Sequence, residues 1–312
     1  MKKILLILII AGPITVVAQA TDTTYWKKGG VASLNFSQVT LNNWAGGGNN
    51  SIAFNGYLNV FANFKKGRSI WDNTMELGYG LIKQDNAEFV KSDDKINFTT
   101  KYGRQLKKDK DKLYWSMNFN LRSQFDEGFN PDETSIPISK FMAPGYLTIA
   151  LGLDWKPSKY FSLSYAPLTG KITIVNDQDL ADSGAYGVDP AKLDGSGIPI
   201  AGTGSKSRKE FGSYLTASFK KEIFENVSLT SNLQMFSNYV DDPKGIDVNW
   251  ENALLMKINK YLSASIINQL IYDNDIKVIE YDDAGLPTGE SAKVQLKNIF
   301  GLGLAYTFGD KQ

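Results

Sequence analysis

The sequence predicts one all-β domain, a single antiparallel transmembrane β-barrel of about 12 strands with short periplasmic turns and longer extracellular loops. Three observations lead to this prediction. Apolar and polar residues alternate along successive segments, the connections between these segments are alternately short and long, and aromatic residues gather beside the short connections. A period of two is typical of strands whose two faces meet different surroundings.

The C-terminal segment shows the alternation most clearly. Every second residue from Phe300 to Phe308 is apolar or aromatic, whereas the residues between them are mostly small. A strand with one face in lipid needs such a face, with an aromatic residue at the bilayer edge. The ending is also similar to the C-terminal signal of Gram-negative outer-membrane barrels. This last strand must pair with the first, predicted over 25–41, because lipid cannot satisfy an open sheet edge.

Alternation defines each of the other strands in turn. In the stretch 51–64, for example, Phe54 and Leu58 fall on one face whereas Asn55 and Asn59 fall on the other. The predicted strands lie at 25–41, 51–64, 71–81, 95–102, 113–124, 147–155, from 161 up to the loop at 176–209, 211–219, 227–235, 247–258, 261–272 and 297–308, and 261–272 alternates least regularly.

The connections form two sets. Short ones are expected at 65–68, 107–112, 156–159, 223–226 and 259–260. Longer ones are expected at 42–50, 84–94, 126–144, 176–209, 240–245 and 273–290. Short turns on one side and longer loops on the other are the outer-membrane pattern, and an even number of strands places both chain ends on the short-turn side. The longest loop, rich in Gly, Asp and Ser, would be unusual inside a compact soluble domain.

Aromatic residues provide an independent check. A predicted girdle on the apolar faces, beside the short turns, comprises Phe64, Trp71, Trp115, Trp155, Phe161, Phe219, Tyr306 and Phe308. Amphipathic rings at the bilayer edge explain this gathering. The alternative fold, a secreted soluble β-sandwich or solenoid, gives no reason for aromatic residues to collect at one end.

The N-terminus predicts secretion. Lys2 and Lys3 precede an apolar run at 4–10, and the small residues Ala18 and Ala20 flank a cleavage site, so residues 1–20 are expected to be a signal peptide. The apolar run is too short to span a bilayer as a helix. Residues 21–312 would then form the outer-membrane β-barrel domain, and the expected location is the cell outer membrane.

Composition narrows the chemistry. The chain has no cysteine and no histidine, which removes thiolate chemistry, histidine bases and histidine metal ligands, so we expect no enzyme, no catalytic residues and no cofactor. The formal net charge of +1 gives no indication of nucleic-acid binding. Asp177, Asp179 and Asp182 miss the spacing of a calcium loop, so we expect no metal site.

One family resemblance rests on local motifs. The segment Asn43-Trp-Ala-Gly-Gly-Gly-Asn-Asn-Ser51, followed by Trp71-Asp-Asn73 and Gly78-Tyr-Gly80, resembles a family of uncharacterised Gram-negative outer-membrane β-barrel proteins, catalogued as a domain of unknown function. The resemblance implies this location and fold over most of the mature chain, and implies no activity. Within the first motif, Gly46, Gly47 and Gly48 are expected to form a tight loop tip with Trp44 as a lid or interfacial anchor, because no phosphate-loop Lys-Ser/Thr follows.

Charged residues of both signs fall on the predicted inward face. The expected lumen network comprises Asp72, Glu76, Lys95, Lys101, Arg122, Asp247 and Glu251. Glu76 and Lys101 are expected to lie near each other across a hairpin. Two interpretations remain open: salt bridges that fill a narrow lumen, or a polar constriction that selects solutes. A wide water channel usually needs more strands.

These observations favour a narrow pore for small polar solutes. The alternative is a structural or accessory subunit of a larger cell-envelope complex, with the long loops as contact surfaces. A carrier for hydrophobic molecules or a lipid-active enzyme fits the sequence less well, because there is no histidine and no hydrophobic plug segment precedes the first strand. Expected partners are outer-membrane lipid, envelope proteins and small polar solutes, and not nucleic acid.

Overall fold

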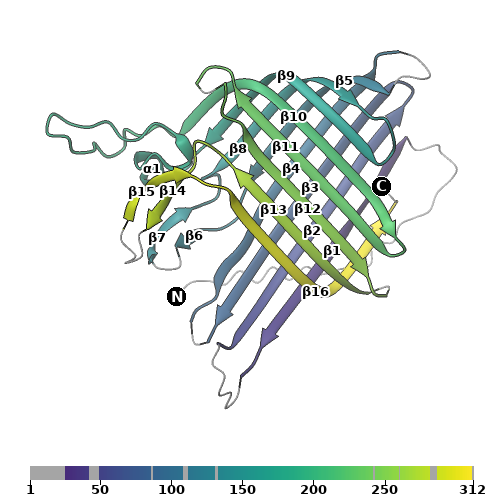
Figure 1. The fold of residues 1–312 in the computed structure, drawn as a ribbon, viewed down its shortest axis with the longest axis horizontal. Helices are drawn as coiled ribbons and strands as arrows, with labels where there is room; N and C mark the ends of the chain where they lie inside the picture. Colours follow the sequence, from purple (N-terminus) through teal and green to yellow (C-terminus); the bar gives the residue numbers. More distant parts are fainter. Residues whose placement is uncertain are drawn as a thin grey trace.

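The computed structural model contains a closed antiparallel β-barrel of 12 strands, as the sequence predicts (Figure 1). It describes residues 25–41, 49–85, 87–107, 112–130, 133–241, 243–259, 261–281 and 287–310. The predicted signal peptide, 1–20, and the loop motif with Trp44, Gly46, Gly47 and Gly48 lie outside the described residues. The barrel strands are β1 (Trp26–Val39), β2 (Ser51–Lys66), β3 (Ser69–Gln84), β4 (Val90–Gln105), β5 (Leu113–Ser123), β8 (Gly145–Trp155), β9 (Phe161–Ile174), β10 (Ser207–Phe224), β11 (Val227–Asn238), β12 (Asp247–Lys257), β13 (Leu262–Tyr272) and β16 (Gln295–Gly309).

The two terminal strands close the barrel. Each strand pairs antiparallel with the next along the chain, and β16 pairs with both β13 and β1. The closing register runs from Gly29 opposite Gly309 to Asn35 opposite Gly303. The prediction that the last strand must pair with the first is therefore confirmed.

Four further strands lie in segments predicted to be loops. β6 (Gly128–Asn130) pairs with β7 (Glu133–Ser139), and β14 (Lys277–Tyr281) pairs with β15 (Pro287–Ala292). Two-stranded hairpins outside the wall have no face in lipid, so they need no apolar period of two and leave little trace in the sequence. Figure 1 shows both hairpins gathered at one end of the barrel with α1, whereas the C-terminus lies at the other. We call these the loop end and the short-turn end.

Two wall strands extend further toward the loop end than predicted. β4 begins at Val90 rather than at 95, and β10 begins at Ser207, inside the predicted loop 176–209. The extension of β4 carries charged residues such as Lys91 and Asp94. Such residues interrupt the alternation of apolar and polar residues, so a polar strand end cannot be distinguished from a loop in the sequence.

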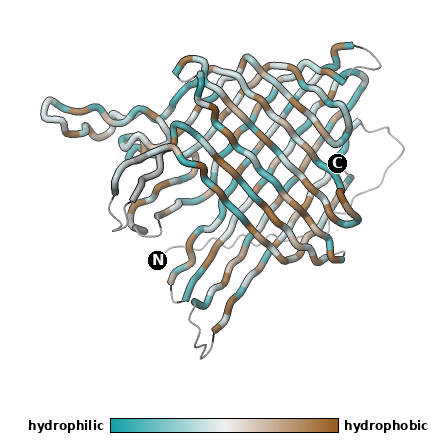
Figure 2. The backbone as a smooth tube through the Cα atoms, viewed as in Figure 1, coloured by the Kyte–Doolittle hydropathy of each residue, from teal (hydrophilic) through white to brown (hydrophobic). Residues whose placement is uncertain are grey.

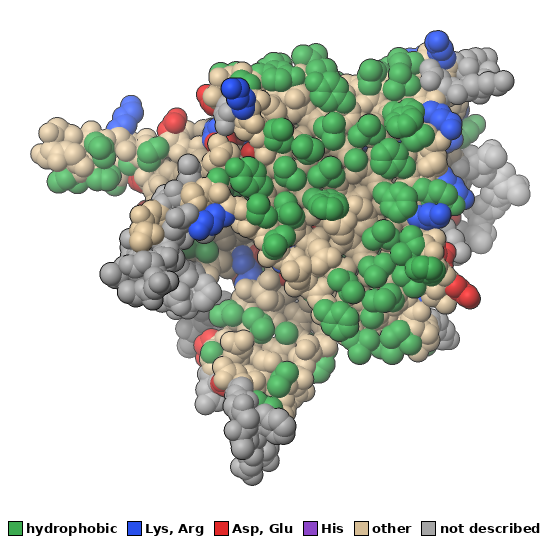
Figure 3. Space-filling view, viewed as in Figure 1, with side chains coloured by type: hydrophobic (Ala, Val, Ile, Leu, Met, Phe, Trp, Pro, Cys, Tyr) green, Lys and Arg blue, Asp and Glu red, His purple; other side chains and the backbone are tan. Residues whose placement is uncertain are grey.

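The outer face of the wall is apolar. Figure 2 shows hydrophobic and hydrophilic residues alternating along the strands, and Figure 3 shows hydrophobic side chains spread over the wall with Lys and Arg mainly at its margins. Large apolar side chains there are widely exposed, as for Leu153 (47%), Leu304 (60%) and Phe300 (72%). Among the described residues, no helix has the length and apolar character needed to cross a membrane.

The predicted girdle residues all lie near the short-turn ends of their strands. Register places Phe64 opposite Trp71 and Phe161 opposite Phe219. Ring pairs continue along this end, with centroid separations of 6.3 Å for Trp155–Phe161 and 6.2 Å for Tyr306–Phe308. The remaining member, Trp115, pairs with Tyr102 at 5.7 Å, and Trp26 packs against both Phe64 and Trp71. Such contacts suit a boundary between hydrocarbon and water.

Candidate functional site

The lumen holds a polar cavity of about 620 Å³. Its lining runs from Asp72 and Lys156 near the short-turn end to Tyr186 and Asp273 at the loop end. All seven charged residues predicted for the lumen network line this cavity: Asp72, Glu76, Lys95, Lys101, Arg122, Asp247 and Glu251. Alternation alone brings them together, because every second residue of a barrel strand points inward.

An ion bridge crosses the middle of the lumen. Lys95 Nζ on β4 lies 3.0 Å from Glu76 Oε2 on the neighbouring β3 and 2.8 Å from Glu251 Oε2 on β12. β12 is opposite β4 in the barrel, since β11, β10, β9, β8 and β5 separate them on one side and β13, β16, β1, β2 and β3 on the other. We call these three residues the central bridge. It spans the full width of the lumen with side chains alone.

Neutral side chains hold the central bridge in place. Asn97 Nδ2 donates to Glu76 Oε2 at 2.8 Å, and Tyr57 Oη and Asn59 Nδ2 both donate to Glu76 Oε1 at 3.3 Å. Glu76 therefore accepts hydrogen bonds on both carboxylate oxygens in addition to its contact with Lys95. Hydrogen bonds and a nearby cation both favour the ionised form of the Glu76 carboxylate.

The predicted proximity of Glu76 and Lys101 is wrong. Register places Glu76 opposite Asn97, and Lys101 opposite Asp72, four residues closer to the short-turn end. Lys101 Nζ reaches Asp154 Oδ2 on β8 instead, at 2.9 Å. The register of this hairpin depends on its turn, and a shift of a few residues exchanges the partners.

A second group of charges lies near the short-turn end. Asp154, whose side chain is fully buried, forms an ion pair with Lys101, while Lys156 Nζ lies 2.8 Å from Asp72 Oδ2 and 3.6 Å from Asp154 Oδ2. Lys156 was expected in a turn. It points into the cavity because it follows the outward-facing Trp155 by one residue, so the period of two could have indicated its orientation.

We expect Asp154→Leu to destabilise the barrel by about 3–5 kcal/mol, because it leaves the Lys101 ammonium in the lumen wall without its counter-ion. Urea unfolding in detergent, followed by the heat-modifiable gel shift, measures the loss. The double variant Lys101→Met with Asp154→Leu should recover most of it, since both charges are then gone. Equal instability of the single and double variants would show that packing, rather than the buried charge, sets the cost.

The loop end carries a third set of ion pairs. Lys171 Nζ lies 2.7 Å from Asp247 Oδ2 and 3.3 Å from Glu210 Oε2, and Arg208 Nη1 lies 2.7 Å from Asp275 Oδ2. Lys171, Arg208 and Glu210 were not predicted as site residues. Arg208 lies within the predicted loop 176–209, so no inward face was predicted for it.

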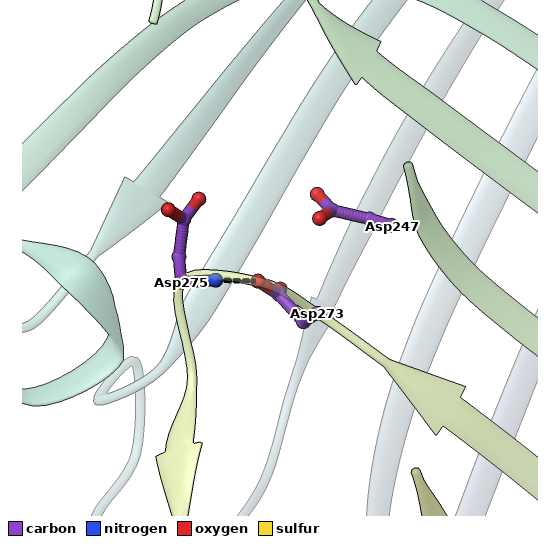
Figure 4. Close-up of side chains that lie close together, drawn as sticks. All are labelled: Asp247, Asp273 and Asp275. Carbon is purple, nitrogen blue, oxygen red and sulfur yellow. Dashed lines mark hydrogen bonds between the residues drawn. The ribbon is translucent and has the colours of Figure 1, made fainter. Parts of the chain in front are cut away.

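Three carboxylates come together at this end. Oxygen atoms of Asp247, Asp273 and Asp275 lie within 4.8 Å of one another (Figure 4). Asp275 N–H donates to Asp273 Oδ1 at 2.9 Å, Asp247 is paired with Lys171, and Asp275 with Arg208. Because two of the three already have cationic partners, we assign the cluster to the ion network and not to a metal centre.

A folded cap partly covers the loop end. Segment 175–206 contains the helix α1 (Gln178–Asp182) and the short 3₁₀ turn η1 (Ala185–Gly187). Val175, Ala181, Val188 and Ala143 form a small buried apolar cluster beneath it. Tyr186 Oη donates to the Ile138 carbonyl oxygen at 2.6 Å, which fastens the cap to β7.

Asp177 joins the cap to the barrel rim. Its carboxylate accepts from Leu180 N–H at 3.1 Å at the start of α1 and lies 2.7 Å from Lys140 Nζ. Asp182 separately accepts from the backbone N–H groups of Gly202 and Gly204, at 2.6 and 2.7 Å. Two of the acidic residues first weighed as calcium ligands are thus used to hold the loop together.

Acid should loosen this cap. The hydrogen bond from Lys140 holds the pKa of the Asp177 carboxyl below its ordinary value of 3.8. Because the pKa of Asp177 is lower in the folded cap than in the unfolded chain, the ionised carboxylate stabilises the cap. This stabilisation is complete above the unfolded value and is lost as the pH falls through the folded value. Pepsin cleavage within 175–206, normalised to an unfolded peptide, should rise between about pH 5 and about pH 2. In Asp177→Asn this rise should be absent, because cleavage is already fast at the higher pH. Equal profiles for the two proteins would contradict the assignment.

The outer surface decides the environment of the molecule. A closed wall with large exposed apolar side chains, bordered by aromatic ring pairs, is stable only where lipid replaces water. This protein is an outer-membrane β-barrel. Its polar groups face inward because the lumen, and not the outside, is where charges can be paired or hydrated.

Part of the chain matches a known family. Residues 36–129 match the family model described as "Protein of unknown function (DUF3078)". The match includes the Trp71-Asp-Asn73 and Gly78-Tyr-Gly80 motifs, so the family resemblance is confirmed over this part of the barrel. The matched stretch is shorter than the resemblance implied, which was most of the mature chain. Five of the seven predicted lumen charges lie within the matched stretch. No curated protein sequence matches the chain.

Several solved barrels resemble this one. The COG4313 outer membrane channel from Pseudomonas putida F1 aligns with a TM-score of 0.39 at 9% identity, covering 93% of this chain and 100% of that one. The NanC porin gives 0.36 at 10% identity, covering 89% and 98%. An active-site mutant of outer membrane phospholipase A from Escherichia coli gives 0.34 at 12% identity, covering 93% of each chain. These scores are too low to carry an argument about activity.

Proposed function

We propose that this outer-membrane barrel is a narrow pore for small polar solutes, with the central bridge as its constriction. The observation that carries the proposal is the polar cavity along the lumen, which is lined by charged and amide side chains and crossed by Lys95 between Glu76 and Glu251. Charged groups facing one another across a bore select solutes by size and charge.

The central bridge obstructs the lumen with mobile side chains and not with backbone. The central bridge consists of side chains on opposite walls, joined by contacts of 2.8 and 3.0 Å. Rearranging a lysine side chain requires no movement of the wall, and such motions are fast. A small hydrated solute can therefore take the place of one contact at a time. Twelve strands leave room for little more, which limits the pore to small molecules.

Conductance tests the proposal. Purified protein, shown to be folded by heat-modifiable gel mobility, should give discrete current steps in a planar bilayer in potassium chloride. The same preparation after heat denaturation is the matched control. A folded, inserted barrel that carries no current, and that stays silent when Lys95 is shortened, would exclude a pore.

A second candidate, an accessory subunit of an envelope complex, is favoured by one observation. The loop that follows α1 and η1 projects from the loop end (Figure 1). Its side chains Leu193 and Ile198 are 62% and 61% exposed. Apolar side chains exposed together on one projecting loop suit a contact with another protein, and Leu193 pairs with Pro199, the neighbour of Ile198. Replacing Leu193 and Ile198 by serine should reduce the size of the complex recovered in mild detergent while leaving conductance unchanged. An unchanged complex would remove this candidate.

A further inference from the structure

Arg122 differs from the other cations that line the lumen cavity. Lys95, Lys101, Lys156, Lys171 and Lys297 each lie within ion-pair distance of a carboxylate. Among the described residues no carboxylate pairs with Arg122, whose close partner is the Tyr146 ring, 5.3 Å from the guanidinium carbon to the centroid. The Arg122 Nε atom is buried and makes no hydrogen bond. Arg122 is thus a lumen cation without a counter-ion.

The strand register aims this group at the cavity. Arg122 on β5 lies opposite Asn97 on β4 and Tyr146 on β8, and all three line the lumen. The Tyr146 ring lies 5.3 Å from the guanidinium carbon, a cation–π contact that leaves the buried Nε–H group without an acceptor. A buried donor without an acceptor is unfavourable, so an acceptor entering the cavity would be bound.

We propose that Arg122 binds the carboxylate of a small organic monoanion in the lumen. This inference rests on the proposed pore and names the class of solute that the pore would favour. The planar guanidinium matches a carboxylate through two parallel hydrogen bonds. The aromatic rings of Tyr146, Tyr214 and Phe236 line the same cavity and can contact a short hydrocarbon portion.

The charges around Arg122 favour one negative charge over two. The neighbouring lysines already have carboxylate partners, so a bound anion meets a single uncompensated positive charge. Asp273 lines the same cavity, and no cation among the described residues lies within ion-pair distance of it, so it repels a dianion more strongly than a monoanion. A phosphate, with a charge between one and two near neutral pH, is therefore a poorer fit than a carboxylate.

Butyrate is a suitable probe, with butyramide as its neutral counterpart. In planar bilayers, butyrate should reduce the chloride-carried current of the wild-type pore saturably, and butyramide should not. Arg122→Gln should raise the half-blocking butyrate concentration at least about tenfold. Arg122→Lys should give an intermediate value, because lysine keeps the positive charge but cannot make the two parallel hydrogen bonds of a guanidinium. Arg104→Gln, which changes an exposed arginine near the short-turn end, is the matched control.

A second readout does not depend on current. Butyrate should raise the temperature at which the folded gel band of the wild-type protein is lost, because ligand binding stabilises the folded state. Arg122→Gln, which removes an unpaired charge and should fold normally, should show no such rise. If the pore conducts but the half-blocking concentration and the thermal shift are the same in both proteins, the Arg122 proposal is overturned and the pore stands. If current is absent but the thermal shift depends on Arg122, the pore fails and the binding site stands.

Discussion

Lys95→Ala is expected to raise single-channel conductance about twofold or more and to make the pore cation-selective. The lysine on β4 reaches across the lumen to Glu251 on β12 and also pairs with Glu76 on the neighbouring β3, so removing it opens the constriction. It also leaves two carboxylates without their shared cation. A constriction that carries uncompensated carboxylates attracts cations and repels anions, and the reversal potential in a salt gradient measures this directly.

A second variant separates the change in size from the change in charge. Adding Glu251→Gln to Lys95→Ala should keep most of the gain in conductance but reduce the cation selectivity, because one of the two carboxylates becomes neutral. Lys297→Ala is the matched control, since Lys297 pairs with Asp93 at 2.9 Å and takes no part in the central bridge. If Lys95→Ala leaves both conductance and selectivity unchanged, the bridge does not lie on the conducting path.

The same substitution has a cost in stability. Removing one partner from a desolvated ion pair costs about 3–5 kcal/mol, because the remaining charges lose their compensation. The hydrogen bonds from Asn97, Tyr57 and Asn59 still satisfy Glu76, so the variant should fold. Its folded gel band should therefore be present, but should convert to the unfolded band at a lower temperature than that of the wild type.

The wall of the barrel could be predicted from the sequence because its cause is local. Lipid outside and charges inside force a period of two, and that period places Glu76, Lys95 and Glu251 on the inward face without knowledge of their neighbours. The same rule failed beyond the membrane. The hairpin at β14 and β15 has no face in lipid, so nothing in its pattern distinguishes it from a loop.

The pairing of the lumen charges could not be predicted, because it depends on properties of the whole cylinder. Lys95 and Glu251 are separated by 156 residues, and they meet only because strand number and stagger bring β4 and β12 face to face across the bore. The same geometry leaves Arg122 without a carboxylate partner among the residues that the structure describes. Local pairing rules gave Glu76 and Lys101 as neighbours, and the register of the hairpin placed them in different layers.

Gly303→Val is expected to prevent the barrel from closing. Gly303 ends the register between β16 and β1, where a Cβ would collide with the carbonyl oxygen of Leu34 and lie 2.7 Å from the Cα atom of Asn35. Both are backbone atoms, so no side-chain rotation can relieve the contact. The register at this seam covers seven residue pairs, whereas β1 and β2 pair over fourteen, so the seam has few other contacts to compensate. An open seam leaves strand edges in lipid, which is strongly unfavourable.

Most of the Gly303→Val protein should therefore remain in the unfolded gel band after refolding into detergent or vesicles. Gly170→Val is the matched control, because this glycine also lies in a barrel strand, β9, but a Cβ there would meet no atom within 4 Å. The control should fold nearly as well as the wild type, apart from a small change in strand propensity. Gly303→Ala should fall between the two, since its single methyl group makes the same backbone contact with less bulk behind it. If Gly303→Val refolded as fully as Gly170→Val, the close approach of β16 to β1 would not be what seals the cylinder, and the seam would have to close in another register.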